Sequence, residues 1–209
     1  MYKKFFKRLI DLCLSAIGIL IAAIPMLIVA IIIKIDSPGP VFFKQKRVGI
    51  HKSYFNIIKF RSMPVTAPKD TPTHELKNAA SLLSPFQEAM RKYSIDEIPQ
   101  LFNIFAGSMS FVGPRPALWN QDLLTAERDK YSANDIKPGL TGWAQINGRD
   151  ELEIPDKARL DGVYVENLSF KMDVQCFFGS VHVFKEDDTI VEGKADALKE
   201  KVEIQGKKS

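Results

Sequence analysis

The chain has 209 residues, enough for one folded domain or for a membrane anchor followed by a small domain. Apolar residues make up 45% and charged residues 26%, which is typical of a folded protein and excludes disorder along the whole chain. The formal net charge of +4 argues against a nucleic-acid partner, because nucleic-acid binders are usually more basic. The basic residues instead flank one long apolar run, as expected at an anionic lipid surface: Lys3, Lys4, Lys7 and Arg8 before it, and Lys34, Lys44, Lys46 and Arg47 after it.

The apolar run is long enough to reach across a bilayer. From Leu12 to Ile33 no residue is charged, and as a helix these 22 residues would extend roughly 33 Å. A cleaved signal peptide fits less well, because no small-residue cleavage site follows the run. Pro25 interrupts the helix, and basic residues flank both ends, so the positive-inside rule selects neither side. We expect residues 1–36 to form a re-entrant membrane helix that breaks at Pro25, with a simple span as the alternative.

A small β-hairpin is predicted next. Residues 36–40 form a turn cluster, after which residues 41–48 and 54–61 read as two strands joined by a short loop. Strand alternation places Lys59 and Arg61 at the end of an otherwise apolar face. The two cations could bind an anion there, or they could belong to a solvated strand end.

The rest of the chain is predicted to be helical apart from a Pro- and Thr-rich surface loop over residues 64–74. Helical patterns cover residues 75–93 (bent near Ser84-Pro85), 94–107, 117–132, 155–167 and 170–185. The last helix carries an apolar stripe that is either core or membrane-interfacial, formed by Phe170, Val174, Phe177, Val181 and Phe184. The predicted fold class is therefore α+β and mostly helical, with one domain over residues 37–190 after the apolar helix and a polar tail over residues 191–209.

Two adjacent carboxylates, Asp96 and Glu97, fall at the start of the clearest helical pattern. Two structural roles compete with a catalytic one. Ser94-x-x-Glu97 matches a capping box, and an acid such as Asp96 is common near a helix N-terminus. Gly107 is a good residue to end the helix. Pro99 removes an amide from the first turn, a departure from which a purely structural helix gains nothing.

Two arginine-bearing loops follow the carboxylates. Arg115 stands between two prolines, which fix the backbone and limit the freedom lost on binding an anion. A salt bridge to a nearby acid is the commoner role of such an arginine. Residues 137–149 contain three glycines and end in Arg149, so their backbone amides could approach a phosphate closely. An ordinary glycine-rich loop packed by Trp143 is the alternative.

Metal and redox chemistry based on histidine or cysteine is not indicated. The three histidines are scattered without metal-ligand spacing. Cys13 and Cys176 are expected to be buried thiols rather than a disulfide, as in a reducing cytoplasm.

Taken together and in this order, the motifs resemble those of one family. The matching stretches are Lys59-Phe60-Arg61-Ser62-Met63, residues 94–101, residues 107–116, residues 138–149 and residues 161–169. The chain is similar to the small monotopic phosphoglycosyl transferases of bacteria, the bacterial sugar transferase group, from Phe6 to about Phe184.

This resemblance implies an enzyme on the cytoplasmic face of the bacterial inner membrane, with a re-entrant helix and interfacial helices around the active site. The implied reaction moves a sugar-1-phosphate from a UDP-sugar to undecaprenyl phosphate and releases UMP, as the first membrane step of glycoconjugate assembly. Asp96 would be the nucleophile of a ping-pong mechanism and a ligand of Mg²⁺, and Glu97 would act on the lipid phosphate or tune Asp96. The implied substrate- and phosphate-binding residues are Lys59, Arg61, Arg115, Gln145, Arg149 and Asp161.

The chemistry of these residue types is consistent with that reaction. A carboxylate and a diphosphate repel each other, so a divalent ion and arginines must offset the charge. The alternative from another class is a non-catalytic membrane-anchored protein that uses the same cations to bind anionic lipid. Hydrolysis of the phosphosugar intermediate by water is a third possibility.

Overall fold

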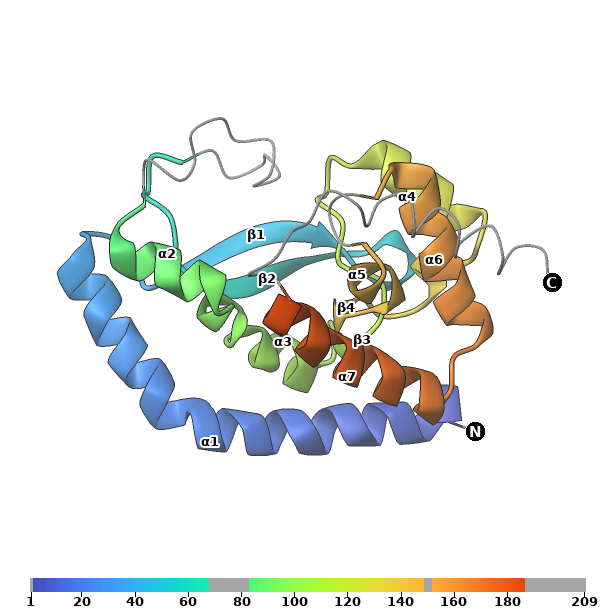
Figure 1. Cartoon of the computed structure of the whole chain (residues 1–209), viewed down its shortest axis with the longest axis horizontal. Helices are drawn as coiled ribbons and strands as arrows, with labels where there is room; N and C mark the ends of the chain where they lie inside the picture. The colour runs from blue at the N-terminus through green and yellow to red at the C-terminus, as the bar shows by residue number, and fades with distance from the viewer. Residues whose placement is uncertain (1, 68–82, 149–151, 187–209) are drawn as a thin grey trace.

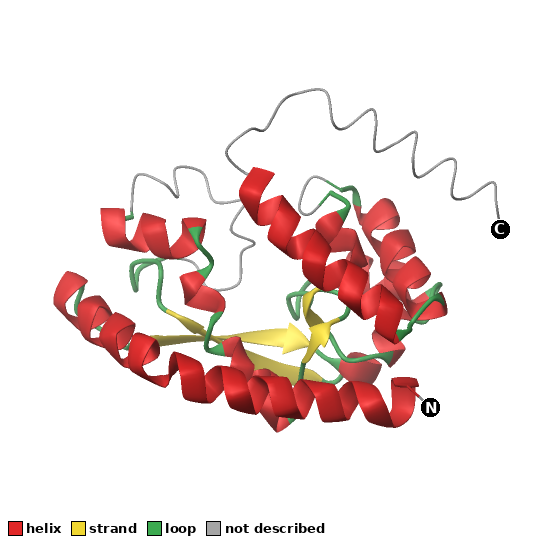
Figure 2. Cartoon of the chain, turned by 60° about the horizontal axis from the view of Figure 1, so that its bottom comes forward, coloured by secondary structure: helices red, strands yellow, loops and turns green. Residues whose placement is uncertain are grey.

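The computed structural model describes residues 2–67, 83–148 and 152–186. This part of the chain is mostly helical, with one long N-terminal helix and two small two-stranded sheets (Figures 1 and 2). The main helices are α1 (Lys7–Asp36), α2 (Pro85–Lys92), α3 (Gln100–Ala106), α4 (Asp122–Asp129), α5 (Trp143–Ile146), α6 (Ile154–Glu166) and α7 (Phe170–Glu186). The strands are β1 (Phe42–Val48), β2 (Tyr54–Phe60), β3 (Ser110–Val112) and β4 (Gly139–Thr141). Shorter turns are η1 (Tyr2–Phe6), η2 (Ile50–Lys52), η5 (Ile95–Glu97) and η6 (Ala133–Asp135).

Helix α1 presents an almost continuous apolar surface to its surroundings. Within the described residues it is the helix whose length and composition would allow it to cross a membrane. Leu20, Ile21 and Ile24 are each more than 70% exposed, whereas Met26 and Ile33 are buried against the domain. Figure 1 shows that α1 runs along one edge of the domain and bends in its second half. The predicted break at Pro25 is absent, because α1 continues through this residue as one helix. Pro25 instead removes a backbone hydrogen bond and accounts for a bend.

The start of α1 is fastened to the domain by charged side chains. Lys7 forms an ion pair with Asp173 of α7 at 2.6 Å. Arg8 donates to the carbonyls of Ile104 and Phe105 at 2.7 and 2.8 Å, and so caps the C-terminal end of α3. One turn later, Asp11 accepts hydrogen bonds from Ser110 and Phe111 of β3.

The end of α1 is fastened to the same domain. The Asp36 carboxylate accepts from Ser84 and Gln87, which form the capping box at the start of α2. The Arg61 guanidinium, just after β2, donates to the carbonyls of Ser37 and Pro38 at 2.7 and 2.8 Å. Both ends of the long helix are therefore bonded to one domain.

The predicted hairpin is confirmed. Strands β1 and β2 pair antiparallel, with Phe42 opposite Phe60 and Val48 opposite Tyr54. Both faces of β2 are covered, because Ile57 packs with Ile104 of α3 and Phe60 packs with residues of α1. Asn103 of α3 bonds the backbone of Asn56 and Ile58, which locks β2 onto α3.

The short parallel pair of β3 and β4 was not predicted from the sequence. Two three-residue strands carry too few side chains to produce a periodic pattern. Glycines make the pairing possible, since a Cβ on Gly139 would lie 2.1 Å from the amide nitrogen of Gly113. The sequence pattern shows the glycines but not which segment they approach.

Several predicted helices are present, with changes at their ends. Residues 155–167 and 170–185 correspond to α6 and α7, whereas the pattern over 117–132 shortens to α4. The predicted helix over 94–107 is divided into η5 and α3 around Pro99, and Gly107 ends α3 in the left-handed conformation as expected. Of the predicted helix over 75–93, residues 75–82 lie outside the described residues and the rest is α2. The predicted tail over 191–209 also lies outside them.

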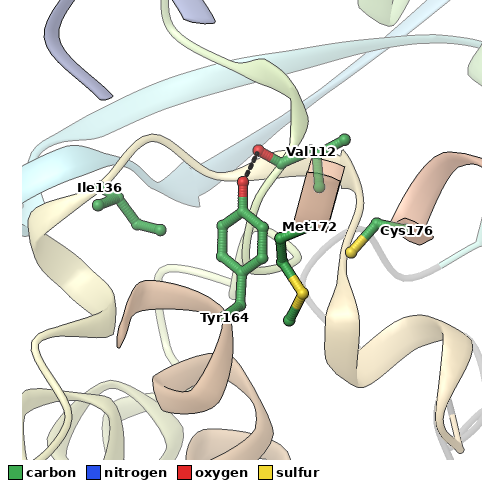
Figure 3. Close-up of a cluster of buried hydrophobic side chains, with 5 residues drawn as sticks. All are labelled: Val112, Ile136, Tyr164, Met172 and Cys176. Atoms are coloured by element: carbon green, nitrogen blue, oxygen red, sulfur yellow. Dashed lines mark hydrogen bonds between the residues drawn. The ribbon is translucent and has the colours of Figure 1, made fainter. Parts of the chain in front are cut away.

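The core of the domain forms where α6 and α7 pack against β3. Figure 3 shows Tyr164 of α6 among Val112, Ile136, Met172 and Cys176, with its hydroxyl donating to the Val112 carbonyl. Burial and the nearby Asp173 raise the pKa of Tyr164, so the hydroxyl stays protonated and acts as a donor.

The structure decides two questions of burial. Of the two roles left open for the α7 stripe, burial in the core is excluded for Phe170, Phe177 and Val181, which are 59%, 53% and 46% exposed, and α7 instead buries Met172 and Cys176. The two cysteines are free thiols as expected, but Cys13 is exposed on α1 rather than buried. In both cases an apolar side chain faces outward, which helical periodicity alone cannot distinguish from burial in a core.

Candidate active site

An open cleft of about 1360 Å³ lies between the hairpin, η5, the loop after β3 and the helices α4 to α7. Seven of the eight residues selected from the sequence line it: Lys59, Arg61, Asp96, Glu97, Arg115, Gln145 and Asp161. The eighth, Arg149, lies outside the described residues. Residues separated by about 100 positions in sequence therefore meet at one cavity.

Asp96 lies in the one-turn η5, not in a regular helix. Ser94 before it adopts the left-handed conformation, with φ of 52°, and Pro99 separates η5 from α3. This tight turn leaves Asp96 8% exposed at the cleft wall, where its Oδ2 accepts a hydrogen bond from Ser62 at 3.0 Å. Among the described residues Oδ1 has no hydrogen-bond partner. Burial raises the pKa of Asp96, and the neighbouring Lys59 partly offsets that rise.

Glu97 does not form the capping box expected from Ser94-x-x-Glu97, because Ser94 caps no backbone amide there. Its Oε1 instead pairs with Lys59 Nζ at 2.6 Å and with Arg115 at 3.4 Å. Burial alone would raise the pKa of Glu97, but these two cations outweigh that effect and hold it at about 2. The two adjacent acids therefore have different environments, since two cations hold Glu97, whereas Asp96 has no ion pair with any described residue.

The loop that carries Arg115 is held on both sides. The Pro114 carbonyl accepts from the Gly139 amide at 2.9 Å, and the Pro116 carbonyl accepts from Arg47 at 2.9 Å. With its backbone fixed in this way, Arg115 extends its half-exposed guanidinium over the cleft beside Glu97. Such a preorganised guanidinium suits phosphate oxygens.

The glycine-rich segment supplies the opposite wall. Its first part is β4, and Gly142 approaches the Gly113 carbonyl so closely that a Cβ would lie 2.1 Å away. Trp143 packs against the core, as the structural alternative expected. Gln145 donates to the Leu140 carbonyl, while its Oε1 is enclosed without a partner among the described residues. The glycines thus bring the segment before Arg149 against the Arg115 loop.

Asp161 forms a buried ion pair that the sequence analysis missed. Both Arg128 Nε and its terminal nitrogen contact Asp161 Oδ2, at 2.8 and 2.6 Å, and the two side chains are 5% and 1% exposed. The sequence contained no signal for this pair, because α4 and α6 are separated by more than 20 residues and meet only in the tertiary structure.

Besides Arg128, Ser62 is a site residue that the sequence analysis did not select. It lies in the Lys59–Met63 stretch that carried the resemblance, and that stretch was the available signal. Arg61, which was selected, directs its guanidinium to the carbonyls after α1 while lining the cleft. A direct contact of Arg61 with a ligand stays a prediction.

A divalent cation would have to be held by few protein ligands here. Within the described residues there is no cluster of three or more acid, histidine or cysteine side chains that could hold a metal. Mg²⁺ commonly takes one or two carboxylates and completes its shell with substrate phosphates and water. Asp96 lies at the cleft wall, and its Oδ1 has no hydrogen-bond partner in the described part of the chain, so it fits that mode.

Comparison with known proteins defines the class. A family model described as bacterial sugar transferase matches residues 2–186. The chain is 38% identical over 169 residues to the uncharacterized sugar transferase EpsL of Bacillus subtilis (strain 168), covering 81% of this chain and 82% of that protein. It is 34% identical over 188 residues to the exopolysaccharide production protein PSS of Rhizobium leguminosarum bv. phaseoli, with coverage of 84% and 92%.

Longer relatives match over the same region. The undecaprenyl-phosphate glucose phosphotransferase of Komagataeibacter xylinus is 39% identical over 182 residues, which cover 82% of this chain and 34% of that protein. The chain spans only about a third to two fifths of such relatives. The protein belongs to the bacterial sugar transferase family.

Proposed function

We propose that the protein is a phosphoglycosyl transferase that moves a sugar-1-phosphate from a UDP-sugar to undecaprenyl phosphate and releases UMP. The observation that carries the proposal is the position of Asp96 in a cleft beside Lys59 and Arg115, a carboxylate next to cations suited to a diphosphate. Relatives named for transfer of glucose phosphate to undecaprenyl phosphate support the choice of substrates.

The proposed reaction has two displacements. An oxygen of Asp96 attacks the sugar-proximal phosphorus, the bond from that phosphorus to the bridging oxygen breaks, and UMP leaves with the electron pair. A phosphate oxygen of undecaprenyl phosphate then attacks the same phosphorus. The bond to Asp96 breaks, which restores the carboxylate and yields the lipid diphosphate sugar. Each step exchanges one phosphorus–oxygen bond for another.

The contacts of Glu97 favour a role in orienting cations. With its pKa at about 2 and two cations on one oxygen, Glu97 is a weak base. It holds Lys59 and Arg115 in the cleft that Asp96 also lines, where they offset the repulsion between the nucleophile and the diphosphate. Mg²⁺ held by Asp96 would supply further neutralisation of the diphosphate and of the departing UMP.

The attachment of α1 at both ends supports a re-entrant, monotopic arrangement. A helix of 30 residues is about 45 Å long, yet Lys7 and Asp36 both bond to side chains of the same domain. A polar domain bonded to both ends cannot have those ends on opposite faces of a bilayer. The active site would then lie at headgroup level on the cytoplasmic side, where the lipid phosphate is.

Exposed aromatic side chains support membrane contact beyond α1. On α3, Phe102 and Phe105 are 37% and 46% exposed, and on α7 Phe177 and Phe178 are 53% and 65% exposed. Phe177 also lines the cleft. Aromatic residues of this kind anchor helices in the interface, so α3 and α7 would rest on the lipid surface.

The covalent step is tested by intact mass spectrometry without acceptor lipid. The protein is incubated with Mg²⁺ and, separately, UDP-glucose, UDP-galactose and their N-acetylated analogues. We expect a sugar-phosphate adduct on Asp96 with at least one donor and none with Asp96→Asn. If every donor leaves the mass of the wild-type protein unchanged, the two-step mechanism is wrong.

The membrane arrangement is tested by labelling. Cys13→Ala serves as the background. In it, Lys3→Cys and Lys44→Cys introduce accessible thiols before and after α1. The background variant alone is the control, because any labelling of it comes from Cys176. A membrane-impermeant maleimide added to sealed, oriented vesicles should label both introduced thiols from the same side. Labelling from opposite sides would rule out re-entry.

A further inference from the structure

The Ser62 hydroxyl is the one neutral side chain that the structure places in hydrogen-bond contact with Asp96 among the described residues. The donor–acceptor distance is 3.0 Å, and Ser62 and Asp96 are 7% and 8% exposed. Among the described residues, Lys59 and Arg115 form ion pairs with Glu97. The Ser62 hydroxyl is the hydrogen-bond donor that contacts one oxygen of the Asp96 carboxylate.

This orientation matters because the torsion that rotates a carboxylate is soft and roughly two-fold. A hydrogen bond to Oδ2 favours one rotamer, in which Oδ1 has no hydrogen-bond partner among the described residues. A nucleophilic oxygen gains most from being held in the attack geometry before substrate arrives, because a misplacement of about 1 Å can cost about 100-fold in rate.

Ser62 is itself held by the neighbouring residues. Phe60 is 1% exposed and packs with Met26 and Ile33 of α1. Arg61 binds the two carbonyls that follow α1, and its backbone amide donates to the Val41 carbonyl at 2.9 Å. Three consecutive residues thus contact, in order, the membrane helix, the chain leaving that helix, and the carboxylate.

The turn after α1 has a shape that accommodates this arrangement. Gly39 has φ of 130°, and a Cβ there would lie 2.0 Å from a terminal nitrogen of Arg61. A side chain at position 39 would therefore displace the Arg61 guanidinium. The position of Ser62 therefore depends on the contacts between Arg61 and the residues that follow α1.

We propose that Ser62 is a positioning residue for the Asp96 nucleophile, and that Arg61 fixes Ser62 relative to the end of α1. The inference rests on the proposed function, because it assumes that Asp96 is the attacking group. It goes further by assigning the step that Ser62 serves, which is formation of the bond to phosphorus rather than binding of the donor.

The test is single-turnover formation of the sugar-phosphate adduct by the full chain in detergent micelles, with Mg²⁺ and the donor that gives the wild-type adduct. Ser62→Ala should lower the maximal rate about 10- to 100-fold, the usual cost of losing a hydrogen bond that orients a ligating carboxylate, with the donor concentration for half-maximal rate almost unchanged. Ser62→Thr retains the hydroxyl and should recover most of the rate.

Ser108→Ala is the matched control. Ser108 is a partly buried serine that exchanges hydrogen bonds with Asn103 and does not line the cleft, so its loss should leave the adduct rate at the wild-type value. If Ser62→Ala reduces the folded fraction, Ser62→Cys replaces it, since a thiol is a weaker donor of similar size and should give an intermediate rate.

Each outcome supports or overturns a specific statement. Absence of an adduct in the wild type with every donor refutes the two-step mechanism on which this inference rests. A wild-type adduct with equal maximal rates for wild type and Ser62→Ala refutes the positioning role. So does a Ser62→Thr variant as slow as Ser62→Ala, or a change confined to the half-saturating donor concentration.

Discussion

Replacing Arg128 with methionine leaves the Asp161 carboxylate buried without its partner. The two side chains are 5% and 1% exposed and are joined by two contacts, so the carboxylate loses both contacts with the guanidinium. Breaking a buried pair from one side typically costs 3–5 kcal/mol. At about 2–4 °C per kcal/mol for a chain of this size, we expect the Tm to fall by about 6–20 °C.

The pH dependence of the decrease in Tm distinguishes a buried carboxylate without an ion-pair partner from a simple loss of packing. Burial raises the pKa of Asp161 even beside Arg128. Removing the guanidinium takes away the charge that opposes this rise, so the folded variant binds the proton more strongly than the wild type does. Stability then falls as pH rises from the unfolded pKa toward the folded one. The Tm deficit of Arg128→Met should therefore be larger at pH 8 than at pH 5.

The measurement is thermal unfolding in detergent micelles, followed by tryptophan fluorescence. Arg128→Met/Asp161→Asn is the control, because it removes the charge from both positions and should recover at least half of the lost Tm. A decrease of less than about 2 °C for Arg128→Met, or a deficit that does not vary with pH, would show that Asp161 is not a buried carboxylate paired to Arg128.

Three further predictions concern packing, charge and metal. Gly162→Ala places a Cβ 2.6 Å from the Tyr131 Cβ and should lower the free energy of unfolding by about 1–3 kcal/mol, measured by thermal unfolding. Gly18→Ala is the control and should cost less, because its Cβ meets only the flexible end of a leucine side chain at 3.2 Å. Equal losses for the two variants would contradict this packing. Because the pKa of Glu97 is lowered to about 2, its contribution to stability is present above the unfolded value of about 4.5 and is lost as pH falls toward 2. Wild type should consequently lose more Tm than Glu97→Gln between pH 5 and pH 3, and parallel curves would refute the ion-pair assignment. EDTA should abolish adduct formation without changing the Tm, and excess Mg²⁺ should restore it; full activity in EDTA would exclude the proposed metal role.

The sequence alone predicted those features that depend on local composition. The stretch of 22 uncharged residues predicted a long apolar helix without tertiary information, and the structure contains that helix as α1. The hairpin and the helices α6 and α7 follow from strand and helix periodicity, and the resemblance of the motifs selected seven residues that line one cleft. Proline 99 marked an irregular turn, although its effect was to divide the predicted helix.

What the tertiary structure decided is which distant groups meet. Glu97 matched a capping box in sequence, but Lys59 and Arg115 approach it through space, and an ion pair of two cations with one carboxylate oxygen replaces the local bond to Ser94. Helical periodicity shows that a face is apolar but not what covers it, so it could not tell that α7 presents its phenylalanines outward. The partners of Asp161 and Asp96 come from separate elements. Their pairing depends on the packing of α4 on α6 and on the position of the chain after β2, which no short window of sequence contains.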